Sequence, residues 1–145
     1  ELRQELSVVL RRIGGLPVRL KPGSRDLYYA AAVFASNHLH AQASWAASLF
    51  ARAGVSRGDA LRVCALLQKD ALGSLARLGF PEAVTGPACR GERAVLARHL
   101  AMLGRIDRGL REAYRLCAME SLRLGLRKGS VTRSDAAQAL RLLSK

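Results

Sequence analysis

The stretch Leu27–Ala51, LYYAAAVFASNHLHAQASWAASLFA, carries no charged side chain, although Lys and Arg occupy 24 of the 145 positions. Its length would suffice for one membrane-spanning helix of roughly 20 apolar residues. Polar side chains along it argue against a span, because each carries a desolvation cost in hydrocarbon. They are Ser36, Asn37, His38, His40, Gln42, Ser44 and Ser48. The stretch therefore predicts a long helix buried inside a helical protein.

Placed on a helix at about 100° per residue, the stretch separates into two sides. One side is an apolar packing arc of Leu27, Phe34, Trp45 and Leu49. The other is a polar stripe of Tyr29, Val33, Ser36, Asn37, His40, Ser44 and Ser48. Buried polar groups need partners. Either the Ser and Asn side chains bond back to helix carbonyls, or the stripe meets water, a second subunit or a ligand.

Composition favours an all-α fold. A chain of 145 residues with 50% hydrophobic side chains can bury a proper core. Aromatic residues make up only 5%, and the dominance of Ala and Leu favours helices over a sheet of β-branched residues.

The formal charge of +13 raises the question of nucleic acid. The basic residues are spread from Arg3 to Arg141 without an interleaved aromatic platform for stacking bases. The densest set, at steps of three and four, predicts one Arg stripe on a helix face, paired in part with nearby acids: Arg105, Arg108, Arg111 and Arg115. A solvated helix face is the favoured interpretation, with an anionic partner as the alternative.

The cysteines and histidines predict no metal site. Cys64, Cys89 and Cys117 are odd in number and lack short spacings. His38 and His40 are two apart and point to different sides of a helix. Three thiols without a secretory signal favour a reducing cytoplasm.

Residues 1–22 have the pattern of an α/β unit. Helical spacing of apolar residues ends at Gly14-Gly15, and Leu16–Leu20 reads as a short strand before a turn. A lone strand cannot satisfy its own backbone groups. We therefore interpret residues 1–22 as a helix-strand remnant of a preceding α/β domain, or as a segment that docks onto another chain. Residues 23–145 are interpreted as a helical domain. Glu1 falls within a helical pattern without an initiator Met, which favours a piece of a longer chain.

Helices are expected from about residue 57 to 77, 92 to 103, 106 to 127 and 133 to 143. Ser56 with Asp59 and Thr132 with Asp135 have capping-box spacing at two of the starts. Gly and Pro residues between 78 and 91 predict an ordered loop. Its segment Thr85–Gly91 contains Gly86 and Arg90, and such a loop either holds an anionic group or simply connects helices.

No complete catalytic set is found, since neither a Ser-His-Asp set nor paired carboxylates nor a phosphate-binding Gly-rich loop is present. Three motifs nevertheless resemble a known family: Tyr28-Tyr-Ala-Ala-Ala-Val-Phe-Ala-Ser-Asn37, Ala76-Arg-Leu-Gly79 and Thr85-Gly-Pro-Ala-Cys-Arg-Gly91. They resemble the helical C-terminal domain, a conserved domain of unknown function, of bacterial Rossmann-like two-domain proteins. Arg12–Leu20 resembles the end of their nucleotide-binding Rossmann domain.

The resemblance implies kinship with ketopantoate reductase, pyrroline-carboxylate reductase and 6-phosphogluconate dehydrogenase. It implies a helical bundle of the dehydrogenase C-terminal type, built around a long central helix. This helical domain would supply substrate contacts and most of a homodimer interface. NAD(P) would be bound mainly by the protein's own N-terminal Rossmann domain. No metal, nucleic acid or membrane is implied.

In the hydroxyacid and ketopantoate types the central helix carries Lys-x-x-x-Asn, with Lys as proton donor and Asn as substrate ligand. Asn37 matches the second position, but Val33 occupies the first. Carbonyl reduction needs a proton delivered with the hydride, and valine has none to give. By geometry His40 or Tyr29 could take the catalytic role; otherwise the cleft has lost its chemistry.

The sequence thus predicts the dimerisation and substrate-binding domain of a cytoplasmic NAD(P)-dependent oxidoreductase-like protein, inactive without its nucleotide domain. The substrate would be a small 2-oxo acid or imine. The predicted catalytic residues are His40 and Tyr29, and the predicted substrate-binding residues are Ser36, Asn37, Thr85, Gly86 and Arg90. The alternatives are a basic helical module that binds nucleic acid and a non-catalytic ligand-sensing scaffold.

Overall fold

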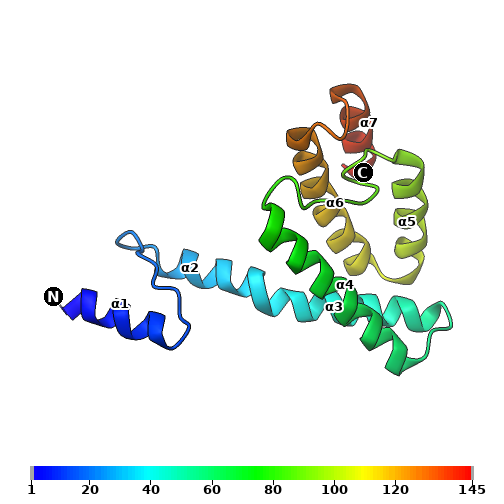
Figure 1. Ribbon diagram of the computed structural model, residues 1–145. Helices are drawn as coiled ribbons and strands as arrows, with labels where there is room; N and C mark the ends of the chain where they lie inside the picture. Colours follow the sequence, from blue (N-terminus) through cyan, green and yellow to red (C-terminus); the bar gives the residue numbers. More distant parts are fainter. Residues whose placement is uncertain (1, 145) are drawn as a thin grey trace. The chain divides into compact units, whose positions relative to one another are not determined.

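The protein is helical in the computed structural model, which describes residues 2–144 apart from the side chain of Arg3. In chain order the elements are α1 (Leu2–Arg12), α2 (Arg25–Ala32), the π-helical turn η1 (Val33–Asn37), α3 (His38–Arg52), α4 (Arg57–Leu78), α5 (Arg93–Ile106), α6 (Arg108–Lys128) and α7 (Arg133–Leu143) (Figure 1). Residues 2–144 contain no β-strand, so the all-α prediction is confirmed. None of the helices within this range combines the length and the apolarity that crossing a bilayer requires.

Side-chain caps set the starts of three helices. The Ser56 hydroxyl accepts a hydrogen bond from the Asp59 amide at 3.2 Å and donates to the Asp59 carboxylate at 2.7 Å. Thr132 and Asp135 repeat both bonds at 3.1 and 2.7 Å. These hydroxyls satisfy amides that have no partner inside the helix. The two predicted N-caps are confirmed, but the reciprocal half of a capping box is not formed, because each carboxylate accepts from the hydroxyl in place of the cap amide.

The contacts divide the chain into two compact units, Glu1–Ser44 and Trp45–Lys145. Their boundary falls inside α3, so each unit is described by itself. The domain boundary predicted after residue 22 stays a prediction.

In the first unit, the segment predicted as a strand does not form one. Residues 15–21 are irregular between α1 and α2, and Leu16, Val18 and Leu20 are exposed. A strand needs a neighbouring strand to pair its amides and carbonyls, and none exists among residues 2–144.

The second unit has a core made mostly by α5, α6 and α7, which pack together in Figure 1. Leucine and alanine fill it: Ala88, Leu96, Leu100, Ala118, Leu122, Ala136, Ala139 and Leu143. Beside this core His99 of α5 meets Tyr114 of α6 through a 2.8 Å hydrogen bond. Burial raises the pKa of the Tyr114 hydroxyl, so the phenol stays protonated and keeps this bond at neutral pH.

The uncharged stretch forms helix, as expected, but it is not buried as expected. None of the described residues of α2, η1 and α3 is buried. On the expected packing arc Leu27 is 74% exposed, Phe34 73% and Trp45 43%. Within its own unit the part of the arc formed by Leu27 and Phe34 is therefore not covered, whereas Leu49 in the second unit is half-buried.

The predicted single Arg stripe is wrong, because a helix boundary interrupts it. Asp107 is extended at φ −162° and ψ 130°, and its carboxylate caps α6 by accepting from the Leu110 amide at 2.6 Å. Arg105 consequently belongs to α5, whereas Arg108 begins α6.

Arg115 on α6 fastens the end of α7. Its guanidinium binds the Glu112 carboxylate in a fork, at 2.7 and 2.5 Å, and donates to the Leu143 carbonyl at 2.8 Å. The arginine thus satisfies a carbonyl in the last turn of α7, where helices lack internal donors. Its side chain is only 21% exposed.

Arg115→Ala is expected to loosen α7 and lower the melting temperature measured by circular dichroism. Arg123→Ala is the control, since Arg123 only pairs with Glu120 on an exposed face and should change stability little. Equal effects of the two substitutions would contradict the fastening role.

The same contact has a pH signature. The hydrogen bond from Arg115 lowers the pKa of the Glu112 carboxyl. A carboxyl with a lowered folded pKa stabilises the protein above its unfolded pKa, and this contribution is lost as the pH falls through the folded value. Arg115→Ala should remove that component of acid sensitivity, which melting curves across the acidic range would detect.

Candidate functional site

The first candidate site surrounds the π-helical turn within the central helix. Residues Val33–Asn37 form this turn, and the His38 amide donates to the Val33 carbonyl, five residues back. Such turns are rare and are frequently found at functional sites. Its first and last residues are the two positions that a Lys-x-x-x-Asn motif would occupy.

The π-turn changes the predicted stripe. A π-bulge accommodates one extra residue, so side chains after it are rotated by about 100° relative to an unbroken helix. Tyr29 lies before the turn, whereas His40, Ser44 and Ser48 lie after it. The prediction of one continuous stripe from Tyr29 to Ser48 is therefore wrong, and the stripe is two segments that meet at Ser36 and Asn37.

Ser36 and Asn37 interact at the centre of this region. The Ser36 hydroxyl lies 2.8 Å from the Ala32 carbonyl and 3.0 Å from Asn37 Oδ1, and it can donate its one hydrogen to either. The bond to a carbonyl one turn back is the ordinary behaviour of serine inside a helix. Asn37 is exposed and keeps its amide NH2 as a donor towards a ligand.

Neither proposed proton donor is held against Asn37. The Tyr29 ring lies under the Arg25 guanidinium, 5.5 Å from its centre, and edge-on to Tyr28 at 6.0 Å. His40 is exposed. Within residues 2–144 no hydrogen bond joins Tyr29 or His40 to Asn37, so the catalytic assignment stays a prediction.

The second candidate site is the loop before α5, and its arginine is already engaged. Arg90 Nε donates to the Glu92 carboxylate at 2.6 Å. This hydrogen bond raises the pKa of the Arg90 guanidinium. Glu92 therefore occupies the Nε side of the guanidinium, and a ligand anion would bind Arg90 through its Nη groups. Thr85 is exposed, and Gly86 adopts φ +98°, a value that favours glycine.

The back of this loop is fixed against the end of α6. Lys128 Nζ donates to the carbonyls of Glu82 and Val84 at 2.8 and 2.9 Å, and the Ser130 hydroxyl donates to the Cys89 carbonyl at 2.8 Å. A Cβ added to Gly125 would approach the Cys89 carbonyl oxygen within 2.2 Å. The loop is therefore a rigid, close-packed element, as its Gly and Pro residues predicted.

The two candidate sites lie in different units. Tyr29, Ser36, Asn37 and His40 belong to the first unit, while Thr85, Gly86 and Arg90 belong to the second. A common cleft that contains both sets stays a prediction.

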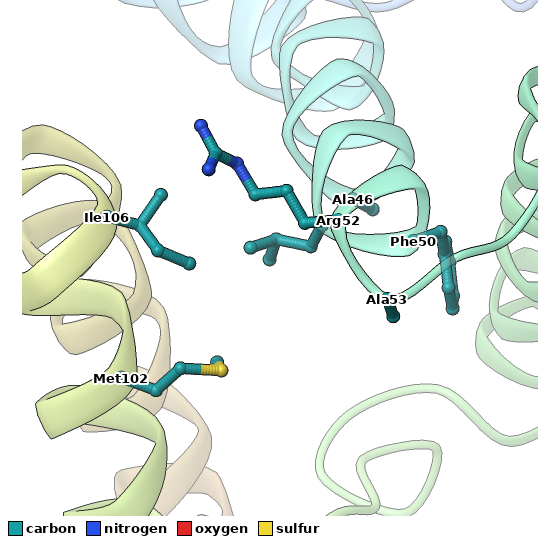
Figure 2. A pocket seen from close by; sticks show the side chains of 7 residues that line it. Ala46, Phe50, Arg52, Ala53, Met102 and Ile106 are labelled. Carbon is teal, nitrogen blue, oxygen red and sulfur yellow. The ribbon is translucent and has the colours of Figure 1, made fainter.

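The structure also contains an apolar hollow that the sequence did not reveal. It has a volume of about 530 Å³ and is lined by Ala46, Leu49, Phe50, Arg52, Ala53, Met102 and Ile106. In Figure 2, Met102 and Ile106 extend from α5 towards α3, and Arg52 extends from α3 towards them. One cation beside an apolar wall suits an apolar group with one anionic end. Of its lining residues the sequence singled out only Leu49, as part of the packing arc. The wall formed by Met102 and Ile106 is about fifty positions further along the chain, so no local pattern connects the two walls.

No group of three or more His, Cys, Asp and Glu side chains gathers as metal ligands in the described part of the chain. The three cysteines form no disulfide; Cys64 and Cys89 are buried and Cys117 is exposed.

The fold and these sites define an all-helical protein with an uncovered, uncharged helix that carries a π-turn, and with a rigid Gly-Pro loop. The chain belongs to the family described as Domain of unknown function (DUF2520), whose model matches residues 1–121. A search of curated proteins and of solved structures found no match.

Gly125→Ala is expected to destabilise the protein by about 1–3 kcal/mol, because the new methyl group would overlap a backbone carbonyl that cannot turn away. The measurement is the free energy of unfolding in urea. Gly73→Ala in α4 is the matched control: its nearest atom is a side-chain nitrogen of Arg77 at 3.7 Å, so replacement of a helical glycine should stabilise by up to about 1 kcal/mol. A neutral Gly125→Ala would contradict the close packing of the loop.

Proposed function

We propose that this chain is the helical dimerisation and substrate-binding domain of a two-domain NAD(P)-dependent oxidoreductase-like protein. It acts only with a nucleotide-binding domain attached. The observation that carries the proposal is the central helix, which has no charge from Leu27 to Ala51 and no buried residue in the described chain.

The occupant of that helix surface is a second copy of the chain. An apolar arc with Leu27 and Phe34 about three-quarters exposed is costly in water. A long helix of small residues permits close approach of a twofold-related helix, and symmetric dimers are the commonest assemblies of soluble proteins. The exposed leucines of α4 add to the uncovered apolar surface: Leu61, Leu66, Leu67, Leu72 and Leu78.

The substrate end of the domain is the π-turn. Asn37 provides an amide donor for a carbonyl or carboxylate oxygen, and Ser36 lies beside it. The excess of basic residues favours an anionic substrate such as a 2-oxo acid. Because Val33 cannot deliver a proton, His40, one turn after Asn37, or Tyr29 takes that role on attachment of the nucleotide domain.

One observation favours a second candidate, a non-catalytic ligand-sensing scaffold. A general acid is usually oriented by a neighbouring hydrogen bond, and no such bond is found for His40 or Tyr29 among the described residues. The scaffold would keep Asn37 and the π-turn for ligand binding and would leave out the proton transfer.

Leu27→Asp is expected to convert the chain from dimer to monomer, since a carboxylate on the packing arc would be desolvated at the interface. Light scattering coupled to size exclusion measures the mass. Leu116→Asp, the same change at an exposed leucine of α6, should leave the dimer intact. A monomeric unmodified chain at high concentration would refute dimerisation. Trp45 is the sole tryptophan and gives an independent fluorescence reading.

Residues 1–145 alone should not bind NADPH, and the two-domain protein should bind it and oxidise it with a small 2-oxo acid or imine. Asn37→Ala in the two-domain protein should lower kcat/KM by about tenfold or more, as expected for loss of a hydrogen bond to a charged substrate. Tight NADPH binding by residues 1–145 would refute the domain assignment. If the unmodified two-domain protein binds NADPH but does not oxidise it with these substrates, the result favours the non-catalytic ligand-sensing scaffold.

A further inference from the structure

A further groove of the molecule lies between α6 and α7, beside the Thr85–Gly91 loop, where Gly91 lies against Val131. It is a groove of about 690 Å³, lined by Met119, Leu122, Arg123, Leu126, Arg127, Val131, Arg133, Ala136, Ala137, Leu140 and Ser144. All but Met119 lie beyond residue 121, where the match to the family ends. The family match therefore covers little of this groove.

The groove has an apolar floor and leucine walls. Leu122 and Ala136 are buried and form the floor, whereas Leu126 and Leu140 are 39% and 41% exposed. On α6 the apolar lining residues recur at steps of three and four, and on α7 the small side chains Ala136 and Ala137 lie between Arg133 and Leu140. Two neighbouring helices with small residues between them leave room for the apolar face of a third helix.

The charged side chains that line this groove are all arginines. Arg123, Arg127 and Arg133 line it, and no acidic residue is among its described lining residues. Arg123 shares Glu120 at 3.0 Å in an exposed pair. For Arg127 and Arg133 no ion pair is recorded within residues 2–144. The excess positive charge complements a partner with carboxylates beside its apolar stripe.

We propose that the α6–α7 groove docks an acidic amphipathic helix of a partner protein. Leucine-like side chains of the partner enter between Leu126 and Leu140, and its carboxylates meet Arg127 and Arg133. A second copy of this chain fits poorly, since its own helices are rich in Arg. A nucleic acid would need stacking or a polar floor, and a membrane would need protruding apolar side chains where this surface is hollow.

The test uses the whole chain and a labelled probe peptide of about 16 residues, with leucines along one helical stripe and glutamates elsewhere. Fluorescence anisotropy measures its affinity. A second peptide has the same leucines with lysines in place of glutamates. The proposal expects binding of the acidic peptide, weakening as salt rises, and none of the lysine peptide.

Variants separate the groove from the general charge of the chain. The double variant Arg127→Glu with Arg133→Glu should lower the affinity for the acidic peptide by about tenfold or more, because two attractions become repulsions. Arg98→Glu, an exposed position of α5 outside the groove, should change affinity by less than about twofold. Leu140→Gln should also weaken binding while its salt dependence stays the same. Arg133→Glu alone keeps the test valid if the double variant is unstable, since a carboxylate suits the first turn of α7.

Equal weakening by Arg98→Glu would overturn the proposal, because it would show attraction to the overall charge only. The proposal also fails if the chain ignores the acidic peptide but binds phosphatidylglycerol vesicles or duplex DNA through Arg127 and Arg133. The proposal fails as well if Arg127→Glu changes the oligomeric state of the chain in the absence of peptide, because the groove would then be a contact between copies. None of these outcomes depends on NADPH binding or on Leu27.

Discussion

An uncharged helix without cover is the constraint on which the rest of this molecule depends. Burial of apolar surface is the main favourable term in folding, yet the central helix buries none of its residues in the described chain. The core cluster of the second unit is formed by α5, α6, α7 and Ala88, and it contains no residue of α3. The helix is therefore free to contribute its apolar arc to something outside the chain, which is why the proposed function is built on assembly.

Local signals predicted most of the helices, because the interactions that start and stop a helix lie within a few residues. Ser56, Thr132 and Gly14 are next to the boundaries that were predicted from them. A break between two helices was expected near residues 103–106, yet Arg105 was counted in one stripe with Arg108, because the capping ability of Asp107 between them was not considered. The absence of a strand at residues 16–20 has a different reason: strands depend on partners, which local sequence cannot supply.

The candidate sites were less predictable than the helices. The π-turn has no composition of its own, and its presence moves every later side chain away from the position that a regular helix assigns. The anchoring of the Thr85–Gly91 loop by Lys128 and Gly125 joins residues about forty positions apart. The ion pair of Arg90 with Glu92 could have been read from their spacing, but it needed the loop conformation to show that the guanidinium is engaged. The roles predicted for Ser36 and Asn37 in substrate binding stay predictions.

Because of the π-turn, the deletion of a single residue would change which side chains the central helix presents. Removal of one residue between Val33 and Asn37 would restore regular helical pairing and turn the whole of α3 by about a quarter of a revolution against α2. No new side chain would be needed to present a different set of residues to the same partner or ligand. Length variation of one residue at this point is thus a simple route by which related chains would change what their central helix recognises.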